Sequence, residues 1–114
     1  MSTKEIAKTI QQQIFAIGFP IVMSWGPSDY KSVSEKVLKD FKVEGMGALK
    51  FQVSGMKFKG IVLVVLNFMD TYDIYFGKVE KNEFKIEKTF ENIYCDQLGT
   101  IIDEYVEKQD NYRF

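Results

Sequence analysis

The sequence predicts an α+β domain, in which an antiparallel β-meander of four to five strands carries an N-terminal and a C-terminal helix packed on one face. Apolar residues recur at helical spacing near both ends of the chain. Between residues 48 and 90 they instead alternate with polar residues or form short runs separated by tight turns. Helices segregated to one face of hairpin-linked strands are typical of the α+β class. With 114 residues, the chain is expected to form a single domain, residues 1–114.

The expected N-terminal helix has a start signal, an apolar stripe and a stop signal. Ser2 and Glu5 have the spacing of a capping box, in which two residues satisfy each other's free backbone N–H groups. Gly18 and Pro20 are expected to end the helix, because Gly suits the left-handed position after the last turn and Pro cannot continue it. The stripe consists of Ile6, Ile10, Ile14 and Ile17.

The stretch between this helix and residue 47 gives a weaker pattern. Residues 21–25, IVMSW, predict a short strand, and residues 26–30 predict a turn around Pro27. In residues 31–47, apolar side chains four apart favour a short helix, whereas alternation near the end favours a strand. The residues spaced by four are Val33, Val37 and Phe41.

From Ala48 onward the period of the sequence becomes two, as in half-buried strands. Four strands joined by three short connections are predicted, within residues 48–54, 57–67, 70–79 and 83–90. Residues 95–108 then predict a helix whose apolar stripe is Leu98, Ile101, Ile102 and Tyr105. The polar residues 109–114 are expected to fray.

Several chemistries lack the side chains that they require. The chain has no histidine and a single arginine, Arg113, which removes Ser-His and Cys-His pairs and arginine phosphate clamps. Asp70 and Asp73 could bind a cation or transfer protons, but their position at a hairpin turn favours structural roles. Cys95 is expected to be a small buried residue. We therefore expect no catalytic residues, no metal site and no cofactor.

The single cysteine and the N-terminal sequence indicate a cytoplasmic protein. One cysteine allows no intramolecular disulfide, which fits a reducing compartment. The first residues lack the layout of a signal peptide. The longest strongly apolar run, residues 61–66, is too short to cross a bilayer, so no membrane association is expected.

The strand within residues 57–67 is apolar on both of its faces. If Val62 and Val64 face the helices, the alternate residues must face the other way. A solvated sheet face is not expected to be so apolar, so residues 31–47, the C-terminal tail or another chain should cover it. The apolar residues expected on this outer face are Ile61, Leu63, Val65, Tyr75 and Val79.

Two functions follow from this face. In the first, a protein partner or a second copy docks on it, with Trp25 near the rim, because Trp and Tyr are frequent at interface hot spots. The alternative is single-stranded nucleic-acid binding, in which Tyr75 stacks on a base and lysines contact phosphates. These lysines are Lys50, Lys57, Lys59 and Lys85. A net charge of −1 and the aliphatic character of the face count against the alternative.

Four stretches of the chain resemble a set of small proteins encoded by phages and mobile elements, notably of gut Bacteroidota. They are SWG (24–26), LKFQVSGMKFKGIVLVVLN (49–67), DTYDIYFGKV (70–79) and YCDQLGTIIDE (94–104). These proteins have no established activity and no assigned catalytic residues. The resemblance implies an intracellular accessory protein of a phage or mobile element.

Overall fold

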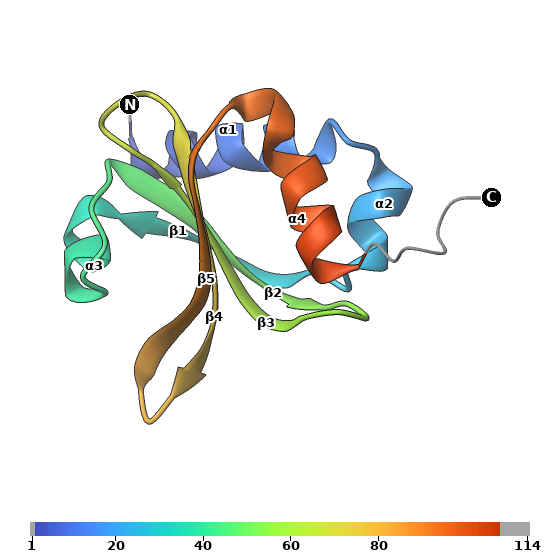
Figure 1. Cartoon of the computed structure of the whole chain (residues 1–114). Coiled ribbons are helices and arrows are strands. Elements are labelled where there is room, and N and C mark those ends of the chain that lie inside the picture. The colour runs from blue at the N-terminus through green and yellow to red at the C-terminus, as the bar shows by residue number, and fades with distance from the viewer. Residues whose placement is uncertain (1, 108–114) are drawn as a thin grey trace.

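A computed structural model describes residues 2–107 as a five-stranded antiparallel sheet with helices packed against it (Figure 1). The strands lie side by side in chain order, and every neighbouring pair is antiparallel. The elements are α1 (Thr3–Phe15), α2 (Phe19–Ser24), β1 (Ser28–Ser34), α3 (Glu35–Asp40), β2 (Gly47–Ser54), β3 (Lys59–Leu66), β4 (Tyr72–Glu80), β5 (Glu83–Ile93), the 3₁₀ helix η1 (Cys95–Gln97) and α4 (Leu98–Val106). The predicted α+β meander with N- and C-terminal helices is confirmed, whereas the predicted tail, residues 109–114, lies outside the described residues.

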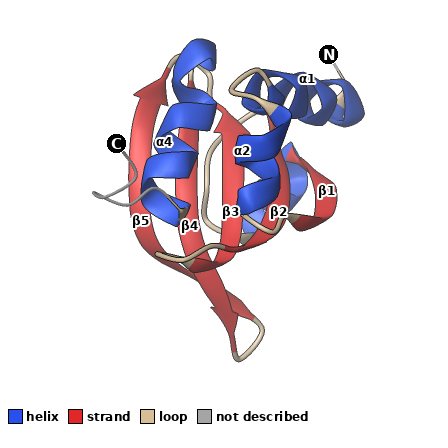
Figure 2. Ribbon diagram, turned by 90° about the vertical axis from the view of Figure 1, so that its right-hand side faces the viewer, coloured by secondary structure: helices blue, strands red, loops and turns tan. Residues whose placement is uncertain are grey.

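Helices α1, α2 and α4 cover one face of the sheet, which we call the inner face (Figure 2). The cap of α1 is largely as predicted: the Glu5 N–H donates to Ser2 Oγ at 3.2 Å, although the Glu5 carboxylate binds the Ser2 hydroxyl instead of the backbone. Side chains of the three helices meet alternate residues of β2, β3 and β4. This inner core includes Ile6, Ile10, Ile14, Phe51, Val62, Ile74, Phe76, Leu98 and Ile102.

The strand predicted at residues 21–25 is wrong, because this stretch lies almost entirely in helix α2. Gly18 has a φ of 125°, a conformation open to glycine, and lets the chain turn directly from α1 into α2. Pro20 then lies in the first turn of α2, where its missing N–H costs no hydrogen bond. Pro20 therefore helps to start a helix rather than only ending one. The strand next to β2 begins later, at Ser28, and contains an irregularity between Ser28 and Lys31.

Trp25 lies in the inner core and not at the rim of the outer face, so that prediction is also wrong. Its side chain is fully buried, and its Nε1–H donates to Oδ1 of Asp103 at 2.9 Å. Asp103 is also buried, so this bond joins the end of α2 to α4 out of contact with water. The frequency of tryptophan at interfaces does not separate an interface from a core, because both bury large side chains.

The opposite, outer face of the sheet is covered in part by a lid, which we define as α3 and the following residues 41–46. Ser34 caps α3 by accepting from the Val37 N–H at 3.3 Å. Leu38 and Val43 of the lid pack on Leu63 and Val65 of β3, and all four side chains are buried. Val33 and Ala48 complete this outer core.

Close approach between the lid and the sheet depends on Gly45. A Cβ atom at this position would lie 2.2 Å from Cγ1 of Val65, so any larger residue would push the lid away. The N–H of Met46 donates to the carbonyl of Leu66 at 2.8 Å and joins the end of the lid to β3. Residues 31–47 therefore cover Leu63 and Val65, which was one of the alternatives that the sequence left open.

We expect Leu38→Ala and Leu63→Ala each to lower the free energy of unfolding by about 2–5 kcal/mol, since each leaves a cavity in the outer core. Urea denaturation followed by circular dichroism measures this. Val79→Ala is the matched control: Val79 is 56% exposed, and its truncation should change stability by less than about 0.5 kcal/mol. Unchanged stability in Leu38→Ala would show that the lid does not cover the sheet.

Candidate functional site

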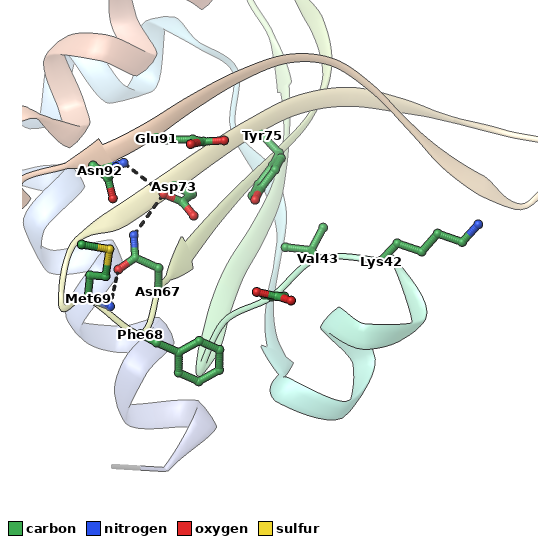
Figure 3. A pocket seen from close by; sticks show the side chains of 10 residues that line it. Lys42, Val43, Asn67, Phe68, Met69, Asp73, Tyr75, Glu91 and Asn92 are labelled. Carbon is green, nitrogen blue, oxygen red and sulfur yellow. Dashed lines mark hydrogen bonds between the residues drawn. The ribbon is translucent and has the colours of Figure 1, made fainter.

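An open hollow of about 520 Å³ lies on the outer face, beside the lid (Figure 3). Its walls come from three parts of the chain that are distant in sequence: the lid residues 42–44, the β3–β4 turn, and the parts of β4 and β5 next to that turn. The antiparallel pairing of β3, β4 and β5 brings these parts together. Side chains from several elements of the fold therefore line one hollow.

The β3–β4 turn is held by the side chain of Asn67, which is only 8% exposed. Its Oδ1 accepts from the N–H groups of Met69 at 2.9 Å and Thr71 at 3.1 Å. Its Nδ2 donates to Thr71 Oγ1 at 2.9 Å and to Asp73 Oδ1 at 3.0 Å. Because one buried amide binds both sides of the turn, the turn has a fixed conformation.

Asp73 has hydrogen-bond partners in the structure, and Asp70 has a turn conformation. Asp73 Oδ1 accepts from Asn67 Nδ2 and also from the backbone N–H of Asn92, both at 3.0 Å. The second bond lies at an irregularity in the β4–β5 pairing, where the Asp73 carboxylate serves as an acceptor for the Asn92 N–H. Asp70 has a φ of 68°, a left-handed conformation that aspartate tolerates in turns. Among residues 2–107, no cluster of three His, Cys, Asp or Glu residues is placed to hold a metal ion.

The turn presents two large apolar side chains to solvent at the edge of the hollow. Phe68 is 59% exposed and Met69 is 76% exposed, and both line the hollow. The outer-face pattern of the strands could not reveal them, because they belong to the turn. The available signal was the pair FM between Asn67 and Asp70, since turns normally carry small or polar residues.

The charged residues that line the hollow are mostly acidic. Glu44 of the lid, Asp73 of β4 and Glu91 of β5 contribute carboxylates, against a single cation, Lys42. Tyr75 is half-buried at the same place. Burial raises the pKa of its hydroxyl, and the three negative charges raise that pKa further.

The structure separates the residues predicted to form one apolar docking face. Ile61, Leu63 and Val65 are buried, with exposures of 8%, 0% and 0%, so they are not exposed anchors in this chain. Tyr75 lines the hollow, and Val79 is exposed near the end of the β4–β5 hairpin. Of the six predicted interface residues, only these last two remain available to a partner.

The four lysines predicted to follow a nucleic-acid backbone do not form one stripe with Tyr75. Lys57 lies in the β2–β3 turn and donates to the carbonyl oxygen of Glu104 at 2.6 Å. Lys85 pairs with Glu83 at 2.8 Å. Along β5 it alternates with Phe84, whose ring contacts the lid, so Lys85 points to the other side of the strand. Lys50 on β2 and Lys59 at the start of β3 remain on the outer side.

Cys95 is exposed, so its predicted burial is wrong. It lies in η1, a short turn before α4 that sequence periodicity did not separate from the helix. The buried side chains of this region begin with Leu98, at the start of α4. Over residues 2–107, no helix has the length and apolar character needed to cross a membrane.

Comparisons with models of protein families, with curated proteins and with solved structures found no match to this chain. The interpretation of the hollow therefore rests on its own geometry and chemistry.

We expect Asp73→Ala to lower the free energy of unfolding by about 1–2 kcal/mol, because the partly buried Asn67 amide loses one acceptor and the exposed Asn92 N–H loses its carboxylate partner. Asp73→Asn keeps an acceptor oxygen and should lose clearly less. Urea denaturation in the presence of a chelator compares the two variants. A rise of several degrees in the melting temperature of the wild type with millimolar Ca²⁺ or Mg²⁺, absent in Asp73→Asn, would instead indicate a metal site.

Tyr75 should also make stability depend on alkaline pH. The pKa of Tyr75 is raised in the folded protein. Its contribution to the free energy of unfolding is therefore complete below the unfolded pKa of about 10, and it is lost as pH rises through the folded pKa. Tyr75→Phe cannot ionise, so from pH 9 to pH 11 it should lose less stability than the wild type. Equal losses in thermal denaturation would show that the Tyr75 hydroxyl has an ordinary environment.

Proposed function

We propose that this chain is a non-catalytic protein-binding module whose docking site is the hollow together with the β3–β4 turn. The observation that carries the proposal is the pair of adjacent large apolar side chains, Phe68 and Met69, held in solvent by a turn of fixed conformation. Exposing such side chains has a cost in solubility. A preorganised turn lowers the entropy lost on binding, which favours a recognition role.

The occupant that fits this site is a segment of a partner protein that carries an apolar side chain next to a lysine or arginine. Phe68 and Met69 offer apolar contacts at one side of the hollow. Glu44 and Glu91 offer carboxylates to a cation, whereas the Asp73 Oδ1 already accepts two hydrogen bonds. Aromatic residues and methionine are enriched at protein interfaces, which supports a protein over a small molecule.

Single-stranded nucleic-acid binding stays the weaker alternative, because the acidic lining around Tyr75 would repel phosphates. The intracellular setting and the origin in a phage or mobile element rest on the sequence resemblance, and they stay predictions.

The test uses the full chain and a display library of random short peptides. We expect selection on the wild type to enrich peptides with a basic residue beside an apolar one. The affinity of the enriched peptides, measured by fluorescence anisotropy, should fall by at least about tenfold with Phe68→Ser combined with Met69→Ser. Glu44→Gln with Glu91→Gln should weaken binding and reduce its dependence on salt.

Met56→Ser is the matched control. Met56 is 73% exposed in the β2–β3 turn, close to the 76% of Met69, but does not line the hollow. Binding should survive this change. If no motif is enriched, or if the enriched peptides bind the Phe68/Met69 variant as well as the wild type, the proposed site is wrong.

A further inference from the structure

The two edges of the sheet differ in how they are protected. At one edge, β1 pairs irregularly with β2, and α1 and α3 pack against it. At the other edge, β5 is the longest strand, with 11 residues. It pairs only with β4, with irregularities near Asn92 and at Glu87. Within residues 2–107, no backbone hydrogen bond outside the sheet ladder involves residues 83–91. An uncovered edge of this length offers unpaired N–H and C=O groups to another strand.

The first part of β5 belongs to an arm, residues 78–86, which extends past the rest of the sheet (Figure 1). The last β4 residue paired with β3 is Gly77, opposite Ile61, so the arm is a two-stranded ribbon. Such ribbons are marginally stable in water on their own, and in this arm Phe84 packs on Phe41 of the lid. The arm also exposes apolar side chains, because Val79 is 56% and Ile86 is 42% exposed.

The hairpin turn determines which backbone groups of the arm point outward. Lys81 and Asn82 have φ values of 52° and 64°, as in a two-residue hairpin turn, and the pair Glu80–Glu83 closes it. In such a hairpin the pair that closes the turn is hydrogen-bonded, and non-hydrogen-bonded and hydrogen-bonded pairs alternate from there along the ribbon. The N–H and C=O groups of Phe84 and Ile86 are therefore directed away from β4, towards the open edge.

The side chains around Ile86 are self-complementary in charge. Lys85 pairs with Glu83 at 2.8 Å and lies opposite Lys78 in the hairpin. Glu87 is the extra residue at the irregularity between Ile86 and Lys88, and it pairs with the same Lys78 at 3.8 Å, which places it on the Lys85 side of β5, opposite to Ile86. If two copies of β5 pair in antiparallel fashion about a twofold axis at Ile86, Lys85 lies opposite the partner's Glu87, and Glu87 lies opposite the partner's Lys85. Opposite charges at directly facing positions stabilise a strand pair.

Other registers fit less well. A centre at Lys85 places Lys85 opposite its own copy and Glu83 opposite the partner's Glu87, so like charges face each other. A centre at Phe84 runs into the turn at Lys81 and Asn82 after one residue. Of these three centres, only Ile86 combines unlike charges, apolar contact and outward backbone groups without running into the turn.

We propose that two copies of this chain associate edge to edge through β5, with the twofold axis at Ile86, and form one continuous ten-stranded sheet. The interface is isologous, since each copy contributes the same strand. It does not depend on the hollow or on the β3–β4 turn, so either proposal can fail while the other stands.

The test is a charge-swap experiment in sedimentation equilibrium on the full chain. Wild type should dimerise, and Lys85→Glu and Glu87→Lys should each weaken dimerisation by at least about tenfold, because like charges then face each other twice. The double variant Lys85→Glu/Glu87→Lys restores unlike pairs and should dimerise like the wild type. An equimolar mixture of the two single variants should form heterodimers for the same reason.

Folding of the variants is checked by urea denaturation. Both ion pairs on this side of β5 are solvent-exposed, so each single change should leave the free energy of unfolding of the monomer nearly unaltered. A wild type that stays monomeric into the high-micromolar range would overturn the proposal. So would single variants that dimerise like the wild type, or a mixture that does not associate.

Discussion

The whole structure depends on β3 being apolar on both of its faces. A strand in which both rows of side chains avoid water must lie inside the sheet and must be covered from both sides. Three helices cover the row that contains Val62 and Val64, and the lid covers Leu63 and Val65. The meander alone would satisfy the backbone of β3, but it would leave one row of side chains in water. The lid, between β1 and β2, therefore covers the second face of β3, although its own sequence has no clear periodicity.

Because the lid is short, it covers only part of the outer face, and the features on which both proposals rest lie where it ends. The hollow lies between the lid and the β3–β4 turn, and the β4–β5 arm leaves the sheet beyond β3. The polar network of Asn67 and Asp73 belongs to this boundary. There the sheet changes from a packed layer to exposed strands, so side chains rather than packing must hold the backbone. The Asp73 carboxylate thus holds the backbone at this boundary.

The periodicity of apolar residues and the turn residues predict regular helices and strands, and the prediction extends only as far as such elements do. The stripe of α1 and the four strands after residue 47 are where the sequence places them, because burial on one face imposes a period of two or 3.6. The strand predicted at residues 21–25 is wrong for a local reason: Pro20 is compatible with both the end of one helix and the start of the next. The predictions that Trp25 lies at the rim of the outer face and that Cys95 is buried are wrong, because burial depends on tertiary packing and residue type only biases it. The hollow could not be predicted from Tyr75 alone, since its other walls come from a lid and a turn that have no periodicity.

The bond between Trp25 and Asp103 has a spectroscopic consequence. Trp25 is the only tryptophan of the chain, and its indole is fully buried between α2 and α4, on the side of the sheet away from the lid. Its fluorescence therefore reports on the packing of the inner helices. Opening of the lid, or a ligand in the hollow, would leave the indole in an unchanged environment. Tryptophan emission is thus a selective reporter of one of the two cores, and events on the outer face need a label placed there.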